Sequence, residues 1–259
     1  MKIVHLGEVV GRSGRKALKA YINQMKEDVD FMLVNAENAA GGFGLTRNVA
    51  EELFSMGIDC LTLGNHAWSK KEGIEIIESD PRILRPANYP KGVAGRGAGI
   101  FTTKGGYKIG VINLMGRIFM EPIDSPFEVG ERIIEEMRKE TPIIIVDFHA
   151  EATSEKGALG VFLDGKVSAV IGTHTHIPTA DERILPNGTA FITDIGMTGP
   201  IDSIIGVKKE QVLERFLYTT PRKFEVAEGP AMVCSLYLEI DPQTGKALSV
   251  RRDKVIISQ

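Results

Sequence analysis

The chain has 259 residues, a formal net charge of −3, 43% hydrophobic residues and 25% charged residues. This composition is ordinary for a globular protein that can bury a sizeable core, and the length allows one large domain or two small ones. The charge balance gives no reason to expect a strong nucleic-acid surface or an anionic-membrane surface.

The sequence contains no apolar stretch that approaches the ~20 residues needed to span a membrane. The opening residues, "MKIVHLGEVVG", have too short an apolar run for a signal peptide. Cys60 and Cys234 each lie in an apolar run, which favours buried thiols over a disulfide pair. We therefore expect a cytoplasmic protein with reduced cysteines and no membrane partner.

Short apolar strands alternate with amphipathic helices in the first third of the chain. Strands are predicted over residues 2–10, 30–37 and 58–66, and helices over 14–28, 48–57 and 69–79. In the first helix Leu18, Tyr21 and Met25 recur at helical spacing. Gly57 is expected to end the second helix, and Ser69 is expected to cap the start of the third.

The pattern changes after residue 97. A hairpin over 98–114, turning at Gly105 and Gly106, is predicted first. Helices follow over 126–140, 153–165 and 208–219, and strands over 143–150, 167–176, 189–196, 231–240 and 246–257. Because no long linker or internal repeat interrupts this order, we expect one α/β domain over 1–259, with mixed sheets and helices outside.

Polar side chains lie at or just after the carboxyl ends of five of the predicted strands. They are Glu8, Glu37 with Asn38, Asn65 with His66, His149, and His174 with His176. The carboxyl ends of strands in an open α/β sheet share one edge, where ligands bind. Carboxylate, amide and imidazole donors suit Fe, Mn, Zn or Co, and the lack of cysteine in the set argues against a structural thiolate zinc site. The sequence therefore predicts a metal site at this edge.

Each motif taken alone has an ordinary structural interpretation. Asn65 and His66 are compatible with a turn, Glu37 and Asn38 with a helix cap, and a lone His149 with a hydrogen-bonded core histidine. The prediction rests on their shared position, since four of the five histidines lie at strand ends.

The "HTH" motif at residues 174–176 carries the most information. Alternation in an extended segment would direct His174 and His176 to opposite sides. The two rings would then share one metal only after a bend, or else would serve two adjacent metals.

Seven sequence blocks resemble a known family. "GEVVGRSGR", "NAENAAGGFGLT", "LGNHAW", "ILRPANYP", "HAEATSEK", "GTHTHIPTAD" and "TDIGMTGP" run over nearly the whole chain. They resemble the YmdB-like family of bacterial calcineurin-like metallophosphoesterases. The resemblance implies a four-layer α/β sandwich, in which two mixed β-sheets pack face to face with helices outside. It also implies phosphodiesterase activity on 2′,3′-cyclic nucleotides and two divalent or transition metal ions, with Fe or Mn favoured and Zn, Co or Mg compatible.

The resemblance also implies a role for each strand-end residue. The first metal would be held by Glu8, Glu37, Asn38 and His176, and the second by Glu37 as a bridge with Asn65, His149 and His174. A bridging hydroxide would be the nucleophile, and His66 would donate a proton to the leaving oxygen.

One position departs from the family pattern, and a second differs only from the wider metallophosphoesterases. Glu8 stands where the family has aspartate, and Val10 stands where wider metallophosphoesterases have histidine. Because metal–ligand distances tolerate only about 0.2 Å, the extra methylene of Glu8 makes the first metal site the weakest part of the assignment.

Substrate contacts are less well defined by the sequence. The glycine-rich loop before Thr46 and Arg47 lets backbone approach a ligand, so these two residues are candidate substrate contacts, and an ordinary flexible loop is equally compatible. Arg117, Glu151, Ser154 and Lys156 are candidates for substrate contacts or for support behind the histidines, with surface salt bridges as the alternative.

Three functions are compatible with these residues. A phosphodiesterase with a small phosphate-ester substrate is favoured. The alternatives are a phosphomonoesterase or nucleotidase on the same site, and a regulatory, RNA-associated protein with a weakened metal site. The sequence leaves a homo-oligomer open.

Overall fold

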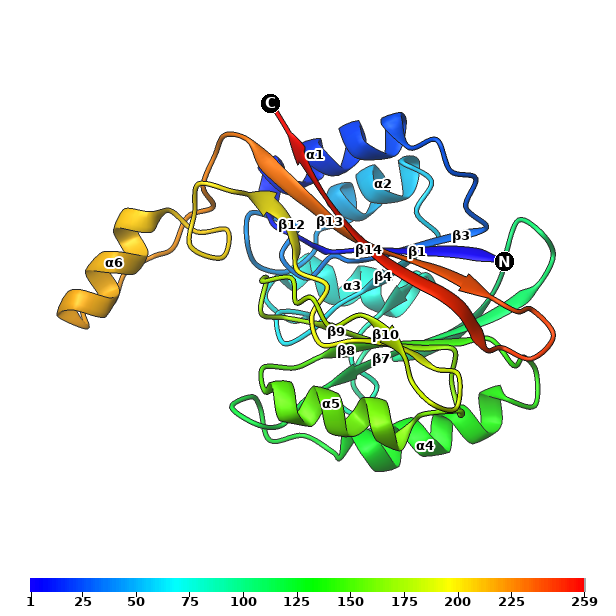
Figure 1. Ribbon diagram of the computed structural model, residues 1–259. Helices are drawn as coiled ribbons and strands as arrows, with labels where there is room; N and C mark the ends of the chain where they lie inside the picture. The colour runs from blue at the N-terminus through cyan, green and yellow to red at the C-terminus, as the bar shows by residue number, and fades with distance from the viewer. Residues whose placement is uncertain (259) are drawn as a thin grey trace.

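Two β-sheets pack face to face between layers of helices in the computed structural model, which describes residues 1–258 (Figure 1). The predicted four-layer α/β sandwich is therefore confirmed. The larger sheet has eight strands, ordered β2-β12-β13-β1-β3-β4-β5, with β14 beside β13. Their bounds are β1 Lys2–Leu6, β2 Glu8–Val9, β3 Phe31–Asn35, β4 Cys60–Thr62, β5 Ile83–Leu84, β12 Met197–Pro200, β13 Ala231–Ile240 and β14 Ala247–Ile257.

The smaller sheet has six strands in the order β10-β11-β9-β8-β7-β6. Their bounds are β6 Ala98–Thr102, β7 Lys108–Met115, β8 Ile144–His149, β9 Ala169–Thr173, β10 Arg183–Ile184 and β11 Ala190–Ile192. The predicted hairpin at 98–114 is confirmed, because β6 and β7 pair antiparallel around Gly105 and Gly106.

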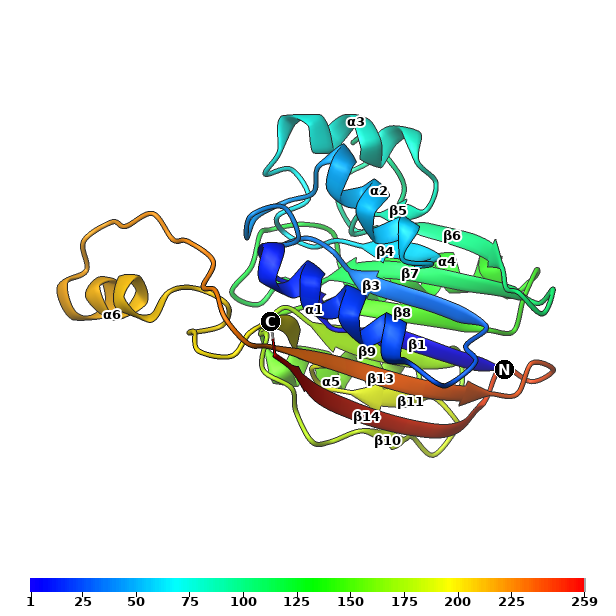
Figure 2. The ribbon, with the colours of Figure 1, turned by 90° about the horizontal axis from the view of Figure 1, so that it is seen from above.

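Helices cover the outer faces of both sheets. The larger sheet carries α1 (Gly11–Gln24), α2 (Arg47–Ser55) and α3 (Lys71–Ser79), and the smaller sheet carries α4 (Pro126–Met137) and α5 (Thr153–Phe162). The sixth helix, α6 (Lys209–Tyr218), extends away from this body in both ribbon views (Figure 2). Among the helices of the described chain, none is both long and apolar enough to cross a membrane.

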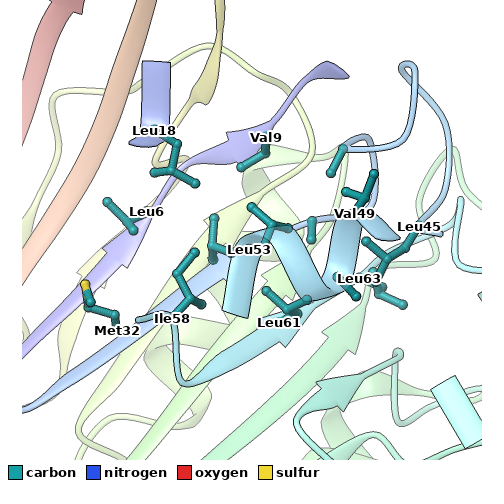
Figure 3. Close-up of a cluster of buried hydrophobic side chains, with 14 of the residues drawn as sticks. Leu6, Val9, Leu18, Met32, Leu45, Val49, Leu53, Ile58, Leu61 and Leu63 are labelled. Atoms are coloured by element: carbon teal, nitrogen blue, oxygen red, sulfur yellow. The ribbon is translucent and has the colours of Figure 1, made fainter. Parts of the chain in front are cut away.

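Three apolar clusters hold the layers together. The first packs α1, α2 and α3 on the larger sheet and includes Leu18, Leu53 and Leu61 (Figure 3). The second lies between the two sheets, and the third lies between the smaller sheet and its helices. Cys60 and Cys234 are buried free thiols, as predicted.

Local features differ from the predictions at several points. The helix α3 begins at Lys71 and has no side-chain cap, so the prediction that Ser69 caps it is wrong. The hydroxyl of Ser69 instead lies 3.3 Å from His66 Nδ1. The short strands β5, β10 and β12 were not predicted, because two to four residues give no readable alternation.

Gly172 on β9 provides a test of how tightly the layers pack. A Cβ at this position would overlap the backbone carbonyl of Thr193, whereas a Cβ at Gly157 in α5 would meet no atom within 4 Å. Gly172→Ala is expected to lower the free energy of unfolding by about 1–3 kcal/mol through overpacking. Gly157→Ala is expected to raise it by about 0.4–1 kcal/mol, since the helix already fits alanine. Urea denaturation of both variants checks this, and equal effects would contradict it.

Candidate metal centre

Strands from both sheets deliver the predicted polar side chains to one edge of the molecule. Glu8 is the first residue of β2, and the loops after β3 and β4 carry Glu37, Asn38, Asn65 and His66. His149 ends β8 in the smaller sheet, and His174 and His176 follow β9. Seven of the eight side chains meet there in two adjoining clusters at the seam between the sheets, and His66 joins them through its backbone N–H.

The first cluster is centred on His149 Nε2. This nitrogen lies 2.9 Å from Glu37 Oε1, 3.0 Å from Asn65 Oδ1 and 3.0 Å from His174 Nδ1. Burial would raise the pKa of Glu37, but the adjacent His149 lowers it to about 2, so the carboxylate is anionic at neutral pH. Three polar atoms thus lie about 3 Å from His149 Nε2, and a single proton on this nitrogen cannot form hydrogen bonds to all of them.

The second cluster is centred on Glu8. Its Oε1 lies 2.8 Å from His176 Nε2 and accepts a hydrogen bond from the Asn38 amide, and its Oε2 accepts one from the His174 backbone N–H at 3.2 Å. On the far side of the His176 ring, Nδ1 donates to the Ile205 carbonyl at 2.7 Å. Glu8 therefore joins the two clusters.

The backbone of the "HTH" motif is not extended. His174 has a φ of 101° and His176 a φ of 66°, and residues other than glycine rarely adopt such positive values. The expectation of an extended, alternating segment is therefore wrong. The two rings still point to different partners, His174 to the first cluster and His176 to the second, because the chain bends at both residues.

The donor set fits a divalent cation. Among residues 1–258, Glu37 Oε1 and Asn38 Oδ1 are buried side-chain oxygens that receive no hydrogen bond. One donor atom each from Glu37, His149 and His174 lies within 4.8 Å of the others. Burial, and then the nearby His149, lowers the pKa of His174 to about 3, which leaves its imidazole neutral and able to bind a metal. A cation would satisfy these oxygens and nitrogens together.

A buried polar network holds the His149 ring from behind. Its Nδ1 lies 3.1 Å from Thr173 Oγ1, which donates to Asp147 Oδ1 at 2.7 Å. Asp147 is fully buried, and His5 Nε2 lies 3.6 Å from its second oxygen. Such partners fix the tautomer and direction of a ligating histidine.

Gly64 explains why this position of the "GNH" motif carries no side chain. A Cβ there would overlap both the His149 ring and the Glu37 carboxylate. The glycine therefore lets the loop after β4 approach the first cluster closely.

A second buried contact fixes the loop that carries His174 and His176. Asp194 Oδ2 accepts hydrogen bonds from Lys156 Nζ at 2.6 Å and from the Thr175 backbone N–H at 3.1 Å. Both charged side chains are 1% exposed. Sequence reasoning proposed Lys156 as support but missed Asp194, whose only signal was its place in the "TDIGMTGP" block.

A cavity of about 610 Å³ opens over the clusters. His66 lines it, with Phe43 packed edge-on against the imidazole at 5.0 Å between ring centroids. Glu151 also lines it and lies 3.1 Å from His174 Nε2.

The other candidate substrate residues lie elsewhere. Thr46 accepts from the Val49 N–H and so caps α2, and Arg47 is the first residue of that helix. Neither belongs to the cavity lining within the described chain. The backbone N–H of Arg117 donates to Glu155.

Comparison with known proteins assigns the chain to a family. The family model described as "YmdB-like protein" matches residues 4–252. The chain belongs to the YmdB-like family. It is 47% identical over 254 residues to the 2′,3′-cyclic-nucleotide 2′-phosphodiesterase of Bacillus subtilis, covering 97% of this chain and 96% of that protein.

Solved structures agree with this membership. A crystal structure titled as a novel phosphatase from Mycoplasma pneumoniae superposes with a TM-score of 0.93 at 35% identity, covering 100% of this chain and 94% of that chain. The calcineurin-like phosphoesterase YfkN from Bacillus subtilis shares the fold alone, with a TM-score of 0.52 and 13% identity over 100% of this chain and 90% of that one. The resemblance seen in the sequence blocks is confirmed.

The Lys156–Asp194 pair gives a stability prediction. Lys156→Met leaves Asp194 as an uncompensated buried charge and is expected to lower the free energy of unfolding by about 3–5 kcal/mol. Lys108→Met is the matched control, because Lys108 pairs with Glu140 on the surface, where such contacts contribute about 0–1 kcal/mol. Denaturant melts of both variants measure the difference, and similar losses would refute the prediction.

Proposed function

We propose that the protein is a metal-dependent phosphodiesterase and that 2′,3′-cyclic nucleotides are its substrate class. The observation that carries the proposal is the convergence of Glu37, Asn65 and His174 on His149 Nε2, with one carboxylate oxygen left without a hydrogen bond. The name of the Bacillus subtilis relative supports the substrate class. The cavity above the clusters supplies the space for a small ester.

The chain's own residues would hold two ions. Asn65, His149 and His174 would bind one, Glu8, Asn38 and His176 the other, and Glu37 would be shared between them. Bound ions of this kind neutralise phosphate charge and lower the pKa of water towards neutrality. The protein's part is to keep the donor atoms aligned, which the networks behind His149 and Thr175 support.

The contacts of Glu8 are compatible with a role as a ligand. Its longer side chain reaches His176 Nε2 with one oxygen and the His174 N–H with the other. Burial would lower the pKa of His176, but Glu8 raises it to about 9. A cation that binds at Glu8 and His176 would have to displace this proton, so metal affinity at this point should rise with pH.

His66 would act as the proton donor to the leaving oxygen. Its backbone N–H donates to Glu37 Oε2 at 2.9 Å, which fixes the residue beside the first cluster. Its Nδ1 faces Ser69 Oγ, so we assign the proton transfer to Nε2. The departing alkoxide is a poor leaving group, and such assistance typically contributes ~10²–10⁴ in rate.

Metal analysis with a substrate panel tests the proposed function. The purified protein is expected to contain transition metal, to lose activity on chelation and to regain it with Mn²⁺ or Fe²⁺. It is expected to cleave 2′,3′-cyclic nucleotides and bis(4-nitrophenyl) phosphate faster than 4-nitrophenyl phosphate. Faster cleavage of the monoester would favour the phosphomonoesterase, and no metal-dependent cleavage of any ester would sink the proposal.

Replacement of His66 tests the proton donor. His66→Ala is expected to keep the wild-type metal content and to lower kcat on 2′,3′-cyclic nucleotides by ~10²–10⁴, because the metal donors remain while the leaving oxygen loses its acid. Ser69→Ala is the control, since it removes only the neighbour of Nδ1 and should change kcat far less. Unchanged turnover by metal-loaded His66→Ala would remove His66 from the mechanism.

A further inference from the structure

The cavity above the metal centre extends well past the two clusters. Its volume of about 610 Å³ lies within the ~300–1,000 Å³ usual for sites that take up a whole small molecule, so a phosphate group would leave much of it empty. One wall carries the polar cluster residues. The rest of the lining comes largely from α6 and from the segments that lead to and from it, residues 204–207 and 224–226. We call these three segments together the α6 arm.

The α6 arm presents an apolar and aromatic wall to this cavity. Its apolar lining residues are Ile204, Ile205, Val207, Val212, Phe216, Phe224 and Val226. Phe216 is 80% exposed although it lines the cavity. An exposed aromatic ring beside a polar phosphate site is a typical surface for stacking a planar ligand.

One cation belongs to the same wall. Among the described residues that line the cavity, Arg215 is the sole lysine or arginine. Its guanidinium lies 5.5 Å from the centroid of the Phe224 ring, and within residues 1–258 no carboxylate lies within salt-bridge distance of it. The nearby acids are engaged elsewhere, Glu214 with Arg222 and Glu225 with Lys208. Arg215 therefore offers free donors and a planar face to a ligand.

We propose that the α6 arm is a nucleobase subsite, in which the base stacks on Phe224 and Phe216 and Arg215 donates to the acceptor edge of the base. The inference rests on the proposed function, because the phosphate of the same ligand would lie at the metal centre. The arrangement matches a nucleotide, with its charged ester at the polar wall and its planar ring at the aromatic one.

Two cyclic diesters separate the subsite from the catalytic centre. The first is 2′,3′-cyclic AMP, and the second is glycerol 1,2-cyclic phosphate, which has the same five-membered cyclic ester without a base. Phe224→Ala and Arg215→Met are expected to lower kcat/KM for the nucleotide about tenfold to hundredfold, mainly through KM. Both variants should hydrolyse glycerol 1,2-cyclic phosphate within twofold of the wild type.

Leu217→Ala is the matched control. Leu217 is on the same helix and is 70% exposed, but it does not line the cavity. It should leave both substrates unchanged. Equal losses of Phe224→Ala on the two substrates, or no loss on the nucleotide, would overturn the subsite.

A binding measurement that needs no catalysis tests the subsite separately from the proposed function. Calorimetry of the metal-loaded protein with adenosine 3′-monophosphate is expected to give a Kd about tenfold to hundredfold weaker for Phe224→Ala than for the wild type and for Leu217→Ala. A wild type that hydrolyses neither diester yet shows this loss would retain the subsite and discard the phosphodiesterase. Equal affinity of Phe224→Ala and wild type would discard the subsite whatever the enzyme cleaves.

Discussion

The interaction on which the site depends is the meeting of His149 Nε2 with Glu37 Oε1, a contact between the two sheets. His149 ends a strand of the smaller sheet, and Glu37 follows a strand of the larger one. His149 Nε2 stays about 3 Å from its neighbours on the larger sheet only while the two sheets keep their relative position. The apolar cluster between the sheets maintains that position. The free energy that packs the two sheets therefore also aligns the donor atoms of the candidate metal centre.

The polar groups in the interior have a related role. Asp147 is buried between the sheets, where an uncompensated charge is costly, yet it accepts from Thr173 and stands behind His149. Asp194 similarly pairs with Lys156 while holding the loop at Thr175. Neither Asp147 nor Asp194 is a predicted ligand, but each contacts a residue that positions one. We interpret these two buried acids as residues that hold the donor atoms in position. The backbone at His174 has a positive φ, and it needs fixed partners to keep that conformation.

The sequence predicted the site better than the details around it. Strand ends in an α/β sheet converge, so Glu8, Glu37 and His149 could be placed together from alternation and spacing alone. The bend at His174 could not be foreseen, since only the tertiary contacts of its loop hold non-glycine residues at positive φ. Asp194 was missed for a similar reason, because its partners are distant in sequence. The helix at 209–218 was predicted, but whether a helix packs on the body or projects from it depends on surfaces that periodicity does not describe.

The strand order has a consequence for synthesis. Glu8 lies on β2, and within the described chain β2 pairs with β12, which pairs in turn with β13. In the sequence, β12 begins only at Met197 and β13 only at Ala231. Synthesis proceeds from the N-terminus, and a domain generally folds as a unit. Within residues 1–258, Glu8 therefore has no neighbouring strand beside it until β12, which begins at Met197, has been synthesised. A product that ends before Met197 would therefore lack the strand that pairs with Glu8 and would leave this edge of the larger sheet incomplete.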